Sequence, residues 1–193
     1  MPAFAPPLTD ERGLLLAYLT QQRNGLRYTT YGLTEEQARL APSVSSLSLG
    51  GLIKHVAGVE QFWIQHVIPG TMPDFAAMGD WESQFRLGPD ESLESALARY
   101  QDVAAETEAA IHAISDLNQP VPVPKSAPWF PKDVEFWSVR WVLLHVIEET
   151  ARHAGHADII RESIDKATMF ELQAAAEGWP STEWLKPWTP PEG

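Results

Sequence analysis

Three histidines and a glutamate lie at helical spacing between residues 145 and 156. His145, Glu149, His153 and His156 follow one another at intervals of four, four and three residues. In an α-helix all four side chains lie within an arc of about 80° on one face. The residues between them are rich in valine, leucine and isoleucine, so we expect this helix to be largely buried. Burying ligand-type side chains costs free energy unless their polar atoms are satisfied, and a metal ion would satisfy them.

The spacing offers more than one choice of ligand on this helix. His145 with Glu149, and Glu149 with His153, are four residues apart, the separation at which two helical side chains chelate an ion. One helix cannot complete a metal site alone, so a facing helix must contribute. His55 lies midway along another apolar helical stretch and is the candidate. His145 and His156 are second candidates, as ligands, as residues that orient a ligand, or as groups that transfer protons.

The composition limits which metal and which role are compatible with these residues. The chain contains no cysteine, so any ion must be held by histidine and carboxylate. A set of two histidines and one glutamate leaves positions for water or substrate, as in catalytic zinc sites. The set would suit Zn²⁺ best, and also Ni²⁺, Fe²⁺ or Mn²⁺. The alternative interpretation is that these are ordinary polar residues of a buried helix.

The hydrophobic periodicity predicts an all-α protein. Four long helices are expected, with a short helical turn after the first and a short helix after the fourth; their ranges are about 9–31, 34–40, 49–68, 93–114, 138–164 and 168–178. No stretch alternates with period two, so a sheet is not expected. We therefore predict a four-helix bundle over residues 1–167, and a short helix with a Pro/Trp-rich tail over 168–193 that packs on the bundle.

The sequence also allows predictions for four single residues and for one connecting segment. Glu60 lies on the apolar side of its helix, where a hydrogen bond to a neighbour is expected. His66 and His112 are expected at the surface. Gly155 costs helix stability of about 1 kcal/mol, which a close approach of another helix or of a ligand would explain. Residues 70–90 are expected to be irregular because of their prolines and glycines.

The chain is also unusually rich in tryptophan, with eight in 193 residues. Most of these side chains are expected to pack in the core. Trp63 lies on the second long helix, while Trp137 and Trp141 open the fourth. One of them is expected to form a wall beside the ion.

The net charge of −12 limits the classes of partner that the protein is expected to bind. Nucleic acids and anionic membranes both require basic patches, so neither is expected as a partner. No run approaches the roughly 18 apolar residues of a membrane span, and a cytoplasmic location follows by default. We expect a small-molecule partner, and a homodimer would fit the apolar content.

At these residues the sequence resembles the DinB-like helical bundle superfamily. Within it the chain is similar to the actinobacterial branch related to mycothiol-dependent maleylpyruvate isomerase. The resemblance covers about residues 10–165 and is carried by three stretches, residues 31–38, 47–56 and 145–156. It implies a metal-binding four-helix bundle that uses a low-molecular-weight thiol of the mycothiol type.

The resemblance also implies which residues hold the metal. It places the ligands of the family on His55, Glu149 and His153, and leaves His145 and His156 as neighbours. The activity implied is that of an S-transferase or isomerase-like enzyme acting on small electrophiles. A metal-dependent hydrolase and a non-catalytic bundle that binds a metal or small molecule are the alternatives.

Overall fold

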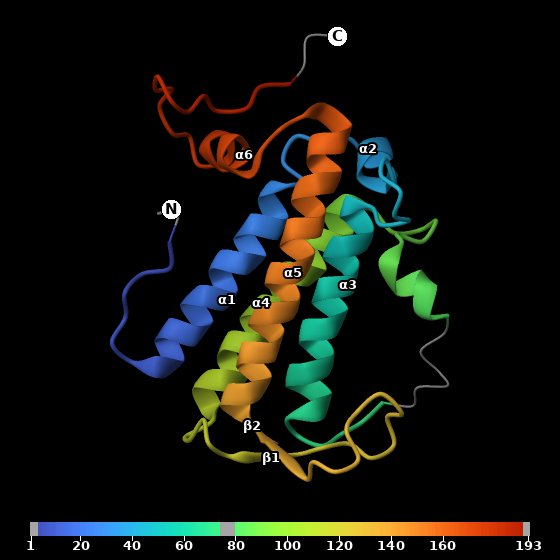
Figure 1. The fold of residues 1–193 in the computed structure, drawn as a ribbon, viewed down its shortest axis with the longest axis vertical. Helices are drawn as coiled ribbons and strands as arrows, with labels where there is room; N and C mark the ends of the chain where they lie inside the picture. The colour runs from blue at the N-terminus through green and yellow to red at the C-terminus, as the bar shows by residue number, and fades with distance from the viewer. Residues whose placement is uncertain (1–3, 74–79, 191–193) are drawn as a thin grey trace.

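The computed structural model describes residues 4–73 and 80–190, and within them the chain is mainly helical. The α-helices are α1 (Glu11–Tyr28), α2 (Glu35–Arg39), α3 (Leu49–Phe62), α4 (Leu93–Ala113), α5 (Val139–Asp165) and α6 (Met169–Ala176). Figure 1 shows the four long helices α1, α3, α4 and α5 side by side as a bundle, with α6 lying across one end. The predicted all-α fold is confirmed.

Polar side chains set where the helices begin. Ser48 and Ser138 each accept a hydrogen bond from the backbone N–H three residues later, as N-caps do. The capping box predicted at Thr34 is present, because its hydroxyl accepts from the Gln37 N–H while the Gln37 side chain accepts from the Thr34 N–H. The first helix begins later than predicted, because Asp10 is its N-cap.

The first helix also ends earlier than its sequence period predicts. Its last residue is Tyr28, and not a residue near 31. Beyond that point the hydroxyl groups of Thr29 and Thr30 donate to the carbonyls of Leu26 and Arg27, at 2.7 and 2.8 Å. Side-chain hydrogen bonds of this kind replace those that would continue the helix.

Helix α3 continues into a wider turn before it stops. Residues Trp63–Val67 form a π-helical turn, η1, closed by the hydrogen bond from the Ile68 N–H to the Trp63 carbonyl at 3.1 Å. Such turns change the direction in which the following side chains point, and they are frequent at functional sites. The end of the helix near residue 68 agrees with the prediction.

Two short segments differ from the expectation. Pro120–Pro122 (β1) and Phe136–Ser138 (β2) pair as antiparallel strands, with Val121 opposite Trp137. Three-residue strands are too short for alternation to be read from sequence. Trp81–Phe85 (η3) forms a 3-10 helix inside the stretch predicted to be irregular; residues 74–79 of that stretch, including Gly79, lie outside the described residues.

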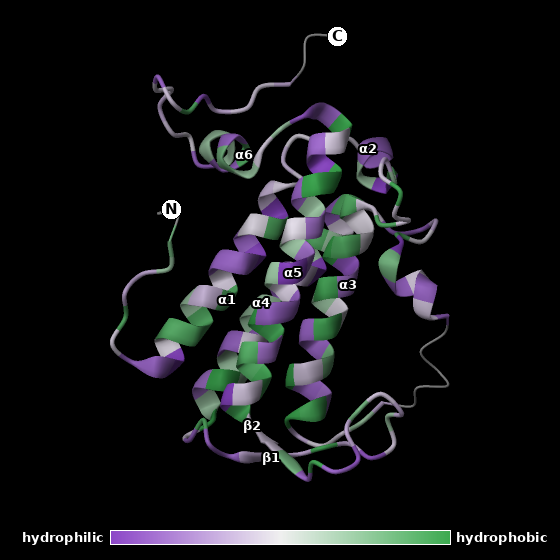
Figure 2. Cartoon of the chain, in the orientation of Figure 1, coloured by the Kyte–Doolittle hydropathy of each residue, from purple (hydrophilic) through white to green (hydrophobic). Residues whose placement is uncertain are grey.

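The apolar faces of the helices meet in two core clusters. Figure 2 shows hydrophilic and hydrophobic positions mixed along each long helix, as expected when one face is buried. One cluster lies nearer the β1–β2 end and includes Leu19, Trp63 and Leu143. The other lies nearer α6 and includes Leu26, Leu52 and Tyr100. None of the described helices is both long and apolar enough to cross a membrane.

A buried ion pair connects three helices of the bundle. Glu60 on α3 is fully buried and accepts two hydrogen bonds from Arg23 on α1, at 2.6 and 3.0 Å. The Thr107 hydroxyl on α4 donates to the same carboxylate at 2.6 Å. The predicted hydrogen-bonding role of Glu60 is thus confirmed.

The C-terminal segment contacts the bundle through a second buried arginine. Arg161 on α5 donates to the carbonyls of Thr29 and Tyr31, both at 2.8 Å, and pairs with Asp165. The ring of Trp188 stacks on its guanidinium, with 4.9 Å between the guanidinium carbon and the ring centroid. The tail therefore covers an arginine that also holds the end of α1.

We predict that Arg23→Met destabilises the protein by about 3–5 kcal/mol, because it leaves the Glu60 carboxylate buried without its charge partner. Urea unfolding followed by circular dichroism measures this. The double variant Arg23→Met/Glu60→Leu should recover most of the loss. Arg86→Met, which breaks the exposed ion pair with Glu82, is the control and should change stability little. Equal losses in both single variants would contradict the prediction.

Candidate functional site

The residues predicted as metal ligands come from two neighbouring helices. His55 on α3 and His153 on α5 lie ring to ring, with 4.8 Å between the centroids. His153 Nε2 is 3.6 Å from a carboxylate oxygen of Glu149, one turn earlier on α5. The antiparallel packing of α3 against α5 thus brings together side chains almost a hundred positions apart in the chain (Figure 1).

Burial keeps both imidazoles neutral. Burial, with a smaller contribution from the neighbouring His153, lowers the pKa of His55 to about 4. Burial also lowers the pKa of His153 to about 4, with added effects of His156 and Arg152. A neutral imidazole is the form that binds a metal.

One imidazole nitrogen of the pair is left without a partner. His55 is 5% exposed, and its Nδ1 has no hydrogen-bond partner among the described residues. A buried polar atom without a partner costs free energy, and a bound ion at this position would remove that cost. Two neutral imidazoles beside a carboxylate form a donor set that fits a divalent ion.

Local sequence explains how His55 is enclosed. Gly51, one turn earlier on α3, lies against the backbone of η3, and a Cβ atom there would come within 1.9 Å of the Phe85 carbonyl oxygen. The missing side chain allows η3 to approach, and the Phe85 ring then stacks on His55 with 3.9 Å between centroids. Phe85 was not predicted from the sequence. The one sequence feature that could have indicated a close approach here is the pair of glycines, Gly50 and Gly51, at the start of α3.

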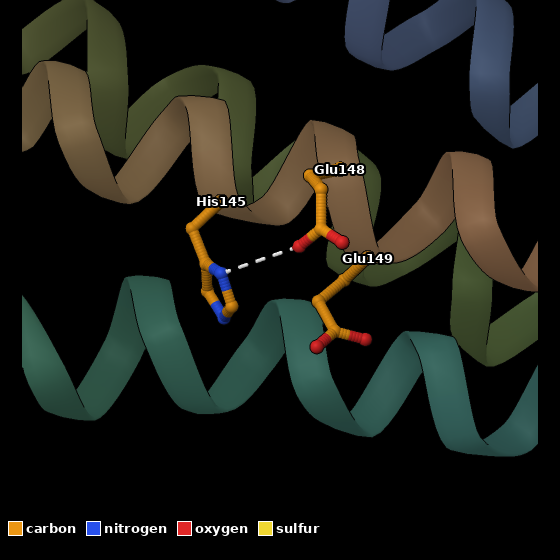
Figure 3. Close-up of side chains that lie close together, drawn as sticks. All are labelled: His145, Glu148 and Glu149. Atoms are coloured by element: carbon orange, nitrogen blue, oxygen red, sulfur yellow. Dashed lines mark ion pairs between the residues drawn. The ribbon is translucent and has the colours of Figure 1, made fainter. Parts of the chain in front are cut away.

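A second set of ligand-type atoms lies nearer the N-terminus of α5, about one turn before His153. Among the described residues, His145, Glu148 and Glu149 each offer a ligand atom within 4.8 Å of the others. Figure 3 shows them on α5, with His145 and Glu148 joined by an ion pair of 3.7 Å. His55, Glu149 and His153 are not gathered this tightly. Glu149 is common to both sets and lies between them.

The remaining histidines occupy different surroundings. His156 Nδ1 is 3.4 Å from His153 Nδ1, so it is the neighbour of a predicted ligand. His112 is exposed, as predicted. His66 is half-buried and lines the pocket described below. A Cβ atom added at Gly155 would meet no atom of the described residues within 4 Å, so no close approach explains this glycine.

A pocket of about 1090 Å³ opens beside the predicted ligands. His55, Glu149 and His153 lie in its wall together with His145. Its lining also includes eight aromatic and three basic side chains: Phe62, Trp63, Trp81, Phe85, Trp129, Phe130, Trp137, Trp141, Lys54, Arg99 and Arg152. The pocket therefore combines apolar rings with positive charge, in a protein whose net charge is −12.

Comparison with known proteins places the chain in a family and identifies a solved structure of the same fold. Residues 14–166 match the family model described as mycothiol-S-transferase. A crystal structure of a conserved protein from Enterococcus faecalis has the same fold, with a TM-score of 0.59 at 17% identity, covering 81% of this chain and 98% of that one. None of the curated proteins compared with the chain is significantly similar to it.

The lowered histidine pKa values predict how stability depends on pH in the absence of metal. Unfolding returns both imidazoles to a pKa near 6.5, so the unfolded chain binds more protons between about pH 4 and 6.5. The stability that the two neutral histidines contribute is fully present above pH 6.5 and is lost as the pH falls toward 4. Asp158, whose pKa burial and Glu162 raise to about 6, acts in the opposite direction.

The variant His55→Leu isolates the histidine contribution. The slope of its free energy of unfolding against pH should be smaller than that of the parent protein. The difference for one proton is up to about 1.4 kcal/mol per pH unit. Denaturant titrations of metal-free protein at intervals from pH 4 to 7 measure both slopes. Equal slopes for the variant and the parent protein would contradict the prediction.

Proposed function

Because the chain belongs to the mycothiol-S-transferase family, we propose that it joins mycothiol, or a similar low-molecular-weight thiol, to a small electrophile. The observation that carries this proposal is the pairing of two neutral histidines and a glutamate in the wall of a pocket large enough for two small molecules. In the reaction the thiol loses its proton, a carbon–sulfur bond forms, and a leaving group departs or a double bond is consumed.

In this proposal His55, Glu149 and His153 hold a divalent ion, with zinc as the first choice. A bound ion would stabilise the thiolate form of the thiol near neutral pH. His55 and His153 are neutral without the ion, so no proton has to leave them when it binds. The enclosure of His55 by Phe85 excludes water from one side of the site.

Two other histidines have roles that their contacts suggest. His156 contacts His153 through Nδ1 and would orient that ring, as neighbours of metal ligands commonly do. His145 lies in the pocket wall one turn from Glu149. There it can take the thiol proton or give a proton to the leaving group.

The basic side chains of the pocket suit the polar part of the thiol. Lys54 and Arg152 immediately precede His55 and His153 in the chain, and all four line the pocket. Lys54 is already paired with Glu91 at 2.7 Å, whereas Arg152 is exposed. We propose that these cations bind the hydroxyl and carbonyl oxygens of the thiol cosubstrate.

We predict that His153→Ala abolishes binding of one Zn²⁺ per chain and lowers thiol-transfer activity by on the order of 100-fold or more, since a catalytic ion contributes several kcal/mol. Elemental analysis and a coupled rate assay with mycothiol measure the two effects. The matched control is His112→Ala, an exposed histidine outside this pocket, which should retain both. Full metal content and full rate in His153→Ala would refute the proposed ligand set.

Chelation distinguishes an open catalytic ion from a structural one. Because the proposed site uses three protein ligands, we expect a chelator to remove the ion while far-UV circular dichroism shows the bundle still folded. Activity should return when Zn²⁺ is added. Unfolding that accompanies metal removal would instead favour a non-catalytic bundle with a structural ion.

A further inference from the structure

The first turns of α5 carry a row of nearly parallel rings. Trp137, just before the helix, stacks on Trp141 with 4.6 Å between centroids and 3° between planes. Trp141 in turn stacks on His145, at 5.3 Å and 11°. The spacing of four residues places Trp141 and His145 above one another on one helix face, and Trp137, in β2, continues the row.

Two further rings lie across this row. Trp63, in the π-helical turn after α3, is 4.5 Å from His145 and meets that ring at 69°. The same indole is 5.3 Å from Trp137 and 5.3 Å from Phe130, which belongs to the connection between β1 and β2. We call Trp63, Phe130, Trp137 and Trp141 the aromatic wall.

The aromatic wall is only partly buried, although its rings pack on one another. Trp63 is 5% exposed and continuous with the core, but Trp141 is 40% exposed. All four side chains line the pocket that also holds the predicted metal ligands. Aromatic side chains that remain partly exposed inside a pocket are typical of a binding site for an apolar ligand.

The wall lies at a defined position relative to the proposed metal ligands. Trp141, His145, Glu149 and His153 follow one another at intervals of four residues along α5. Trp141 is therefore about 12 Å along the helix axis from Glu149, at 1.5 Å per residue. A molecule bound against the wall would therefore lie on the His145 side of Trp141, in the direction of a sulfur held near Glu149.

From this arrangement, and resting on the function proposed above, we infer that the electrophile is a planar aromatic molecule bound against the aromatic wall. The rings of the wall would stack on its faces and edges, as aromatic pairs prefer. For an aryl halide, sulfur forms a bond to the ring carbon, the carbon–halogen bond breaks, and halide leaves. The thiol proton passes to solvent or to His145.

The test compares two electrophiles that react with thiols by displacement of halide. Chlorodinitrobenzene is planar and aromatic, whereas iodoacetamide is small and aliphatic. With mycothiol as cosubstrate, Trp141→Leu should lower kcat/KM for chlorodinitrobenzene about tenfold and leave that for iodoacetamide within about twofold. The matched control is Trp184→Leu, because Trp184 is 80% exposed and does not line the pocket; it should change neither value.

Binding of unreactive dinitrobenzene, measured by quenching of tryptophan fluorescence, separates this inference from the proposed function. Weaker binding to Trp141→Leu supports the aromatic wall even if neither electrophile reacts with thiol, an outcome that would refute only the proposed transferase activity. Absence of dinitrobenzene binding, or equal loss with both electrophiles, overturns the inference and leaves the transferase intact. If Trp141→Leu does not fold, Phe130→Leu, in the connection between the strands, replaces it.

Discussion

The buried carboxylate of Glu60 constrains the arrangement of the whole bundle. It is fully buried, and it is satisfied only where Arg23 of α1 and Thr107 of α4 reach it together. Removing any of these contacts would leave a charge or hydroxyl in the core, so α3 has one acceptable rotation about its axis. His55 lies five residues earlier, about 140° around the helix, and the same rotation turns it toward α5.

The two ends of the bundle have different roles in positioning the site. Toward α6, the buried Arg161 holds the end of α1, and Trp188 covers it. At the opposite end, the π-helical turn η1 and the β1–β2 pair bring Trp63 and Trp137 within 5.3 Å of each other. The predicted ligands lie between the two ends, on the straight parts of α3 and α5, where helices hold side chains most rigidly.

A stability cost is concentrated at His55 and His153. Two imidazoles pack against each other in a buried place, and one Nδ1 is left without a partner in the described structure. An apolar pair of similar size would pack there without that cost. Retaining polar atoms that stability does not require is typical of a functional site, and here it coincides with a pocket and with membership of the mycothiol-S-transferase family.

The sequence by itself determined the helices and most of their limits, because caps such as Ser48 and Ser138 and the apolar period of 3.6 residues act over a few neighbours. It also identified His55, Glu149 and His153 as candidates, through one helical face and a resemblance. Only the tertiary structure showed that His55 and Glu149 each lie beside His153, that Phe85 encloses His55, and that Glu149 also adjoins His145 and Glu148. It likewise decided where α1 ends, how β1 pairs with β2, and that His66 lines the pocket. These features depend on contacts between segments distant in the chain, and local spacing carries no information about which residues such contacts join.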